Sequence, residues 1–293
     1  MDSLILDGTE AARKVRAGIK EKVKALKEAG FPAPVLAVII VGEDPASQTY
    51  VANKEKACGW VGIGSRIIRL PNDCSENVLL EKIDELNRDS SVNGILVQLP
   101  LPSHIEERRV IDAIIPEKDV DGFHPINVGR LQIGSGDAFV SCTPAGIIEL
   151  MHQNGISAEG KHAVVCGRSN IVGKPMAQLL LKENATVTLC HSHTKNLKEL
   201  TLQADILVCA IGKPLFFDAS YIKTGAVVID VGIHRTENGL VGDADTASML
   251  GIASAYTPVP GGVGPMTIAM LLSNCLKAYE NQHHLSKSEA SEE

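Results

Sequence analysis

The chain has 293 residues, a formal net charge of −7 at pH 7 and 44% hydrophobic residues. This length exceeds that of one small domain, so we expect two domains, each with its own core. The acidic charge and the small number of aromatic residues exclude a nucleic-acid binder, which needs a basic face and stacking rings, and leave a small molecule as the expected partner.

Cysteine usage and the absence of long apolar segments predict a cytoplasmic protein. The seven cysteines are odd in number and widely spaced, and none stands in a C-x-x-C pair, a pattern typical of reduced thiols in a cytoplasmic protein. Acidic residues flank the short apolar stretch in residues 1–15, unlike a secretory signal or a transit peptide. No segment approaches the roughly 18 apolar residues of a membrane span, so we expect no membrane partner.

Helices and strands alternate in the first half of the chain. A helical pattern over residues 10–29 ends at Gly30, and the β-branched run 35–42 predicts a buried parallel strand. Asp44 and Pro45 are suited to open the next helix, which ends among glycines. Further strands are predicted over 66–70 and 94–100, and further helices over 75–88 and 104–114. This alternation predicts a mostly parallel sheet.

The periodicity breaks over residues 129–142 and then restarts. Thr143 and Pro144 predict a capped start for a helix over 145–155, so we place the domain boundary near residue 140. Strands over 162–167, 185–190, 205–210 and 226–232 follow, separated by helix-length connections. We therefore expect a first domain at 1–140 with the apolar helix 266–282 packed back on it, a Rossmann domain at 141–265, and a disordered polar tail at 283–293.

The turn between the strand 162–167 and the next helix has the context of a dinucleotide-binding motif. Gly167 and Gly173 allow a tight turn and close helix packing, and the amides at the helix start suit a pyrophosphate. The spacing is not G-x-G-x-x-G, so an ordinary β-α turn that uses glycines for its geometry explains the motif equally well.

The polar residues around this turn favour one dinucleotide. Arg168 and Ser169 lie in it, and the next strand ends in "CHSH" (190–193), where an NAD site usually offers a carboxylate to the ribose. Cationic and hydroxyl groups in place of that acid favour a 2′-phosphate and hence NADP. His191 and His193 lack a third ligand, so no metal is predicted, and we expect His191 and Ser192 to be polar loop groups near the adenosine.

Tyr50 and Lys54 stand four residues apart on a predicted helix and therefore share one face, while Glu55 and Lys56 take the wetter side. A lysine held against a ring and partly withdrawn from water can exchange protons near neutrality. The alternative is an ordinary surface lysine, because lysines are almost always exposed.

Two further segments suit a flat, nitrogen-rich ligand. Asp119 and Asp121 point the same way in an extended chain and together suit an amino-heterocycle, although a turn in which Asp bonds its own backbone is the commoner arrangement. The segment 257–267 combines prolines and glycines ahead of a helix, which favours a stiff loop that a ligand can approach closely over a bare linker.

Six motifs occur in one order: "YVANK", "GILVQLPLP", "DVDGFHPINVGRL", "CTPAG", "GRSNIVGKP" and "TPVPGGVGPMT". Over almost all of residues 1–282 the chain thereby resembles the methylenetetrahydrofolate dehydrogenase/methenyltetrahydrofolate cyclohydrolase family, in its bifunctional, bacterial-type form. The resemblance implies an N-terminal α/β folate-binding domain, a C-terminal Rossmann-like NADP-binding domain, a cleft between them, and a homodimer formed through the second domain.

The resemblance also implies roles for individual residues. Tyr50 and Lys54 are the active-site pair, with Gln98 contacting Lys54 and the folate, and Asp121 anchors the pterin. The implied substrate-binding set is Tyr50, Lys54, Val97, Gln98, Leu99, Asp121, Pro260, Gly261, Gly262, Val263 and Gly264. The implied NADP-binding set is Gly167, Arg168, Ser169, Ser192 and Ile233.

The implied activity is oxidation of methylenetetrahydrofolate with NADP, followed by hydrolysis of methenyltetrahydrofolate to formyltetrahydrofolate, with Lys54 handling the proton of the hydrolysis. Two alternatives stay open: a monofunctional dehydrogenase of the same fold, and a non-catalytic dinucleotide-binding sensor. The presence of all four active-site residues speaks against the sensor. Lys54 and Gln98 favour the cyclohydrolase over the monofunctional enzyme.

Overall fold

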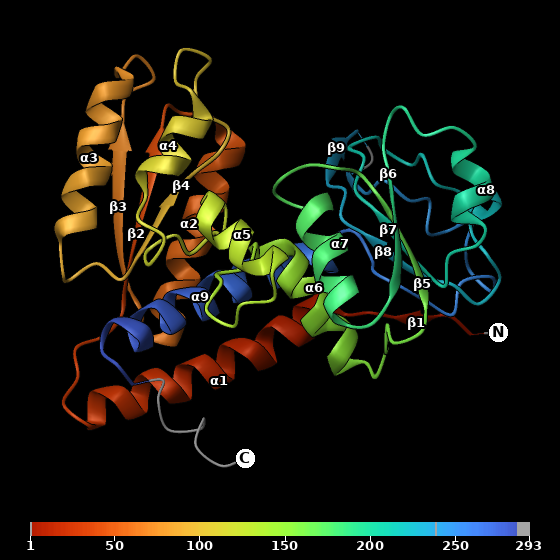
Figure 1. Cartoon of the computed structure of the whole chain (residues 1–293), viewed down its shortest axis with the longest axis horizontal. Coiled ribbons are helices and arrows are strands. Elements are labelled where there is room, and N and C mark those ends of the chain that lie inside the picture. The colour runs from red at the N-terminus through yellow and green to blue at the C-terminus, as the bar shows by residue number, and fades with distance from the viewer. Residues whose placement is uncertain (1, 238, 286–293) are drawn as a thin grey trace. The chain divides into compact units, whose positions relative to one another are not determined.

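The computed structural model describes residues 2–237 and 239–285 and divides into two compact α/β units (Figure 1). Unit 1 contains the N-terminal residues up to Arg13 together with Ser141–Thr267, and unit 2 contains Lys14–Val140 together with the residues from Ile268 on. Each unit is built on its own parallel sheet.

The sheet of unit 2 has three parallel strands in the order β3-β2-β4. Every residue of the central strand β2 (Val35–Val41) after the first is buried, as expected for a β-branched run between two neighbours. β3 (Gly64–Leu70) and β4 (Gly94–Val97) flank it. The strand predicted over 94–100 ends at Val97, because Pro100 and Pro102 have no N–H with which to extend the ladder.

The helices of unit 2 begin and end at residues with clear local roles. The side chain of Asp44 accepts a hydrogen bond from the backbone N of Ser47 (2.8 Å) at the start of α2, and Gly62, with φ at +83°, ends this helix. Unit 2 holds α2 (Pro45–Val61), α3 (Glu76–Arg88), α4 (Glu107–Ala113), α5 (Pro125–Gln132) and the greater parts of α1 (Gly8–Glu28) and α9 (Val263–Gln282).

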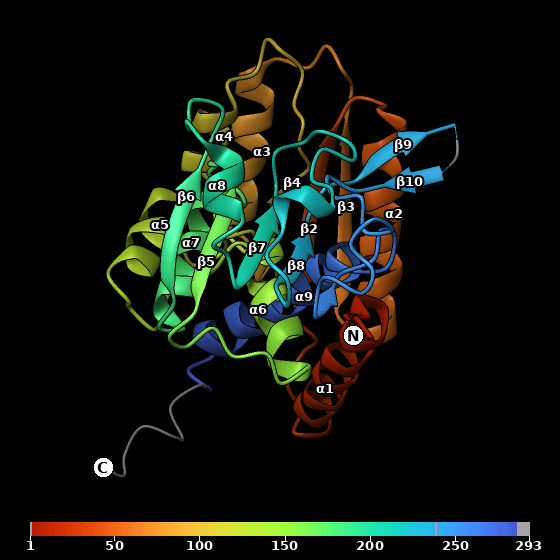
Figure 2. The ribbon, with the colours of Figure 1, turned by 90° about the vertical axis from the view of Figure 1, so that its right-hand side faces the viewer.

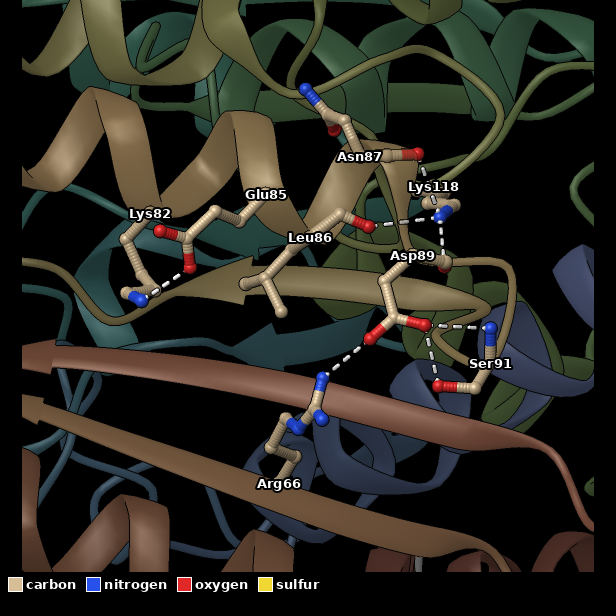
Figure 3. A network of polar contacts seen from close by, with 8 residues as sticks. All are labelled: Arg66, Lys82, Glu85, Leu86, Asn87, Asp89, Ser91 and Lys118. Atoms are coloured by element: carbon tan, nitrogen blue, oxygen red, sulfur yellow. Dashed lines mark hydrogen bonds and ion pairs between the residues drawn. The ribbon is translucent and has the colours of Figure 1, made fainter.

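A buried lysine closes the C-terminal end of α3 (Figure 3). Lys118 Nζ donates to the carbonyl oxygens of Leu86, Asn87 and Asp89 at 2.9, 2.9 and 2.7 Å, which uses all three of its donors. The Asp89 carboxylate accepts from Ser91 and from Arg66 of β3, and these hydrogen bonds lower the pKa of Asp89 to about 2. The turn between α3 and β4 is thereby joined to the segment that precedes Asp121.

The C-terminal part of α9 is joined to unit 2 by side-chain hydrogen bonds. Asn274 Nδ2 donates to the carbonyl oxygens of Val120 and Val140 at 2.8 and 3.0 Å. The predicted disordered tail began at residue 283, but the ring of His283 stacks on Tyr279 with centroids 4.0 Å apart, so the ordered chain extends past that boundary. Residues 286–293 of the predicted tail lie outside the described residues.

The sheet of unit 1 has six strands in the order β1-β11-β8-β7-β5-β6, and every neighbouring pair is parallel. Figure 2 shows β6, β5, β7 and β8 side by side. The strands are β1 (Leu4–Ile5), β5 (His162–Cys166), β6 (Thr186–Cys190), β7 (Ile206–Cys209), β8 (Val227–Asp230) and β11 (Ala255–Tyr256).

The first residues of the chain differ from the prediction that placed them in the first domain. β1 pairs with β11, and the backbone N of Leu4 and of Leu6 each donate across this pair at 2.8 Å. A strand of two residues has no readable alternation, and its place depends on a partner some 250 residues away, so the sequence contained no local signal for it. The hairpin of β9 (His234–Thr236) and β10 (Gly239–Val241) was not predicted either, because its strands are also too short to show an alternation in the sequence.

The start of α6 (Cys142–Gln153) also differs from its prediction. Thr143 was expected to open the helix, but the helix begins one residue earlier, and the Thr143 hydroxyl lies 2.9 Å from the hydroxyl of Thr267. Unit 1 also contains α7 (Gly173–Lys182), α8 (Leu197–Thr201) and the short η1 (Ala219–Tyr221). None of the helices in the described part of the chain is long and apolar enough to cross a membrane.

The cap on α3 leads to a stability prediction. Replacing Lys118 with Met removes three hydrogen bonds and leaves carbonyl oxygens without their donor, so the free energy of unfolding should fall by about 1–3 kcal/mol. Urea unfolding followed by circular dichroism measures this change, with Lys22→Met at an exposed position of α1 as the control. Equal unfolding midpoints for the two variants would contradict the structural role of Lys118.

Candidate functional site

The first candidate site lies in unit 2, where α2 approaches the residues after β4. Lys54 Nζ donates to Gln98 Oε1 at 2.9 Å. The backbone N of Gln98 donates to the carbonyl of Ile39, and its Nε2 donates to the carbonyl of Leu99 at 2.7 Å. Because its amide nitrogen is occupied in this way, Gln98 presents its oxygen to the lysine.

The faces of α2 explain why Lys54 points toward β4. Ala57 and Val61 are buried on the side of the helix that packs in the unit, whereas Glu55 and Lys56 are exposed. Lys54 is half-buried between these sides, and Tyr50, one turn earlier, leaves 42% of its surface exposed. The lysine is therefore held by a specific partner while an aromatic ring beside it stays available for contact with a ligand.

A small cavity adjoins the end of β4. Its volume is about 20 Å³, and apolar side chains of β4 and α4 provide most of its wall. Its lining residues are Ile95, Leu96, Val97, Leu99, Val110, Ile111, Ile114, Asp119, Asp121 and Phe123. A cavity of this volume has room for about one water molecule, and the carboxylates of Asp119 and Asp121 are the charged groups in its wall.

Asp119 and Asp121 have different surroundings although they are two residues apart. The Asp119 carboxylate accepts from the backbone N of Phe123 (3.2 Å), the backbone N of His124 (2.9 Å) and the side-chain amide of Asn127 (2.9 Å). Burial raises the pKa of Asp119 against the opposing effect of these bonds. Asp119 therefore organises the loop, as the turn alternative predicted, and the half-buried Asp121 is the better candidate for ligand contact.

The second candidate site is the turn after β5 in unit 1. Gly167 has φ at +128°, and a Cβ there would lie 2.1 Å from the carbonyl oxygen of Ala210. A Cβ on Gly173 would lie 2.0 Å from the carbonyl oxygen of Gly167. Both positions therefore admit only glycine, and they bring the start of α7 close to the end of β5, as a dinucleotide-binding turn requires.

Polar side chains surround this turn and the turn after β6. Ser169 Oγ accepts from the backbone N of Val172 (3.1 Å) and of Gly173 (3.4 Å) and so shapes the loop, whereas Arg168 and Ser192 are exposed. His191 and His193 contact each other edge to face, and the backbone N of His193 donates to His191 Nδ1. Within residues 2–237 and 239–285, no group of three or more His, Cys, Asp or Glu side chains is arranged to hold a metal ion.

The glycine-rich segment before α9 is tightly packed within unit 1. The backbone N of Thr9 donates to the carbonyl oxygen of Gly261 at 3.0 Å, and a Cβ on Gly8 would lie 1.7 Å from the oxygen of Gly262. Ile233, 46% exposed, lies with Cδ1 3.5 Å from where a Cβ on Gly264 would stand. One residue of the expected NADP set thus adjoins the segment 260–264 of the expected substrate set.

Two buried aspartates in unit 1 were not identified from the sequence. Asp230 is the last residue of β8 and is 1% exposed, and Asp243 follows β10 and is 0% exposed. The only available signal was an acid directly after the apolar run "AVVI", a position at the carboxyl edge of a parallel sheet.

Comparison with known proteins identifies the family. The model of the catalytic domain of tetrahydrofolate dehydrogenase/cyclohydrolase matches residues 6–121, and that of the NAD(P)-binding domain matches residues 141–283. The chain belongs to the tetrahydrofolate dehydrogenase/cyclohydrolase family. The first match contains Tyr50, Lys54, Gln98 and Asp121, and the second contains the turn after β5.

Curated relatives and solved structures of this family agree along nearly the whole chain. A bifunctional protein FolD of Bacillus cytotoxicus is 57% identical over 288 residues, which cover 98% of this chain and 100% of the relative. The FolD dehydrogenase/cyclohydrolase structure from Campylobacter jejuni superposes with a TM-score of 0.93 at 49% identity, covering 96% of this chain and 99% of that one. The Trypanosoma brucei FolD structure, complexed with NADP and an inhibitor, gives 0.92 at 37% identity, with coverages of 97% and 99%.

The close packing of the turn after β5 predicts a selective loss in one variant. In Gly173→Ala, the new Cβ meets the carbonyl of Gly167, so the turn must open and NADP affinity should fall by about tenfold or more. Calorimetric titration with NADP measures this affinity. Gly129→Ala, in α5 with no atom within 4 Å of its new Cβ, is the control and should leave NADP affinity unchanged. NADP affinity in Gly173→Ala equal to that of this control would contradict the turn's role.

Proposed function

We infer that this chain is a bifunctional enzyme of one-carbon metabolism. It oxidises methylenetetrahydrofolate to methenyltetrahydrofolate with NADP and hydrolyses the product to formyltetrahydrofolate. The observation that carries this conclusion is the 2.9 Å hydrogen bond between Lys54 and Gln98, in a chain whose two family domains both match. A lysine oriented in this way favours the bifunctional enzyme over a monofunctional dehydrogenase or a sensor.

The residues of the turn after β5 fit the coenzyme. Gly167 and Gly173 let the end of β5, the turn and the start of α7 pack closely, and the start of α7 supplies backbone N–H groups for phosphate oxygens. We assign the 2′-phosphate to Arg168, Ser169 and Ser192, and the nicotinamide side to Ile233. When bound, NADP accepts the hydride that leaves the methylene carbon of the folate.

We assign folate binding to the residues that the family resemblance implies. Asp121 accepts hydrogen bonds from the amino group and a ring nitrogen of the pterin, while Val97 and Leu99 provide apolar contact and the Tyr50 ring packs on the ligand. The backbone of Pro260, Gly261, Gly262, Val263 and Gly264 contributes to the same substrate. The oxidation depends mainly on this positioning, because the nitrogen lone pair of the substrate stabilises the cation that forms.

The hydrolysis needs a group that moves protons. Water attacks the methenyl carbon, and a C–O bond forms as a first proton leaves the water. The C–N bond then breaks as a proton reaches that nitrogen, and the remaining hydroxyl proton goes to solvent as the C=O bond forms, so one proton is released overall. We assign the removal of the first proton and the protonation of the nitrogen to Lys54. Gln98 Oε1, 2.9 Å from Nζ, holds the lysine beside the reacting carbon and keeps it oriented.

We also propose a cytoplasmic homodimer formed through unit 1. All seven cysteines are free and buried, in keeping with a reducing compartment. β6 lies at the edge of the unit 1 sheet, and its Leu189 is 37% exposed, a feature that favours pairing with a second copy. Light scattering of the purified protein that gives the mass of a single chain would contradict the dimer.

The proposed function is tested by the absorbance of methenyltetrahydrofolate. With methylenetetrahydrofolate and NADP, this absorbance should rise as the intermediate forms, and supplied methenyltetrahydrofolate should lose it faster than in an enzyme-free blank. Oxidation without accelerated hydrolysis would show that the protein is a monofunctional dehydrogenase. Binding of NADP without either reaction would show that it is a sensor.

The role of Lys54 predicts an uneven loss of the two activities. Lys54→Met should slow hydrolysis by about 10²–10⁴-fold, because hydrolysis is the only one of the two reactions in which a proton must be removed from a water molecule. Oxidation should fall less, so the ratio of the two activities shifts toward oxidation, and NADP affinity should be unchanged. Lys56→Met, exposed on the opposite side of α2, is the control. Hydrolysis near the parent rate in Lys54→Met would show that Lys54 is an ordinary surface lysine.

The 2′-phosphate assignment predicts an effect that depends on the coenzyme. Arg168→Gln removes a charge-assisted hydrogen bond worth about 1.5–3 kcal/mol, so KM for NADP should rise by about ten- to a hundredfold. Initial rates measured with NAD should change little, because NAD has no 2′-phosphate. Lys182→Gln, exposed at the far end of α7, controls for the loss of a positive charge. Equal losses with both coenzymes in Arg168→Gln would refute the assignment.

A further inference from the structure

Three ionisable side chains form a network at the carboxyl edge of the unit 1 sheet: Asp230 at the end of β8, His234 at the start of β9, and Asp243 after β10. Both aspartates are buried, and the His234 side chain is 22% exposed. None of the three belongs to the residue sets assigned above to folate or NADP. Their contacts lie within unit 1.

Asp243 connects two loops that are separate in the sequence, the loop after β7 and the loop after β8. Its Oδ2 accepts from the backbone N of Ile211 (2.6 Å) and of Gly212 (2.9 Å), the loop after β7. Its Oδ1 lies 2.7 Å from Nε2 of His234, which follows the loop after β8. One buried carboxylate therefore holds the loops after both strands.

Asp230 holds Asp243 in turn. Its Oδ1 accepts from the backbone N of Gly232 (2.9 Å) and of Asp243 (2.8 Å), and its Oδ2 accepts from the backbone N of Ala244 (2.9 Å). Burial, and to a smaller extent the charge of Asp243, raises the pKa of Asp230 to about 6. The two carboxylates are thus close enough to interact while both serve as acceptors.

The surrounding backbone has no spare room. A Cβ on Gly232 would lie 2.4 Å from both the backbone N and Oδ1 of Asp243, and a Cβ on Gly242 would lie 1.8 Å from Oδ2 of Asp230. Glycine at both positions lets the chain approach the carboxylates closely. The loops can therefore take only a narrow range of positions while the network is intact.

These loops lie where a parallel sheet binds its ligand. Ala210, beside the segment held by Asp243, has its carbonyl oxygen 2.1 Å from where a Cβ on Gly167 would stand, so it sets the position of the dinucleotide turn. The loop after β8 carries Ile233, which is 46% exposed. The network therefore holds two loops of the coenzyme region, the one after β7 and the one after β8, while its own carboxylates stay buried.

We propose that Asp243, held by His234 and Asp230, is a positioning residue for the coenzyme, because it fixes the loops 210–212 and 231–233 in the arrangement that binds NADP. This inference rests on the proposed coenzyme site. It concerns NADP binding and oxidation, since hydrolysis of methenyltetrahydrofolate uses no coenzyme and its assigned side chains lie in unit 2.

The test compares two substitutions at one position. Asp243→Ala removes the acceptor for both backbone donors, so Kd and KM for NADP should rise by about tenfold or more. Hydrolysis of methenyltetrahydrofolate without coenzyme should fall far less than NADP affinity, since the side chains assigned to its proton transfers, Lys54 and Gln98, lie in unit 2. Asp243→Asn keeps one oxygen for Ile211 and Gly212 and places an amide nitrogen opposite Nε2 of His234, so it should restore most of the NADP affinity.

Controls and outcomes separate positioning from general damage. Asp245→Ala, half-buried two residues away, removes the same charge and should leave NADP affinity unchanged. Parent-like NADP affinity in Asp243→Ala, or equal losses of NADP binding and hydrolysis, would overturn the proposal. If Asp243→Ala does not fold, His234→Ala removes one partner of the carboxylate from the more exposed side, and an unchanged Kd for NADP in that variant would overturn it too.

The outcome is also separable from that of the proposed function. Calorimetric binding of NADP needs no folate turnover. A parent protein that binds NADP in a manner dependent on Asp243 but shows neither reaction would retain this inference and reject the proposed function. A parent protein that catalyses both folate reactions, with an NADP affinity that does not change on substitution of Asp243, would support the proposed function and reject this inference.

Discussion

Backbone N–H groups at the carboxyl edge of a parallel sheet need acceptors, because the strands end there and the loops that follow have no neighbouring ladder. Both units meet this need with buried aspartates. Asp119 accepts from the backbone of Phe123 and His124 in unit 2, while Asp230 and Asp243 accept from five backbone donors in unit 1. The loops that carry the functional residues depend on these carboxylates for their shape.

This constraint separates structural charges from those that act on a ligand. Lys118 is buried with three carbonyl oxygens around its ammonium, whereas Lys54 is half-buried and faces one amide oxygen. A group whose hydrogen-bonding capacity is filled by the backbone has nothing left for a substrate. In the segment 118–121, the same reasoning assigns Lys118 and Asp119 to the loop, while Asp121 lines the cavity after β4.

The two reactions make different demands, and the two units reflect them. Hydrolysis needs a proton carrier with a fixed orientation, a role that we propose for Lys54, held by Gln98 in unit 2. Oxidation needs a coenzyme held in place, which we assign in unit 1 to backbone geometry, with glycines where a Cβ would collide and carboxylates that fix the loops. A substitution in one set is therefore expected to change one activity more than the other.

The sequence by itself determined the elements whose signal is local. The apolar runs of β2, β5, β7 and β8 predicted buried parallel strands, Asp44 and Gly62 marked the ends of α2, and six motifs in order indicated the family that the comparisons confirm. Only the tertiary structure decided contacts between distant residues. The pairing of β1 with β11 and the hydrogen bonds from Ile211 and Gly212 to Asp243 depend on which chain segments become neighbours. The contact between Lys54 and Gln98 was implied by the family resemblance, and the structure confirms it. Periodicity and capping report the conformation of a few consecutive residues, whereas burial and hydrogen-bond partners exist only once the chain has folded.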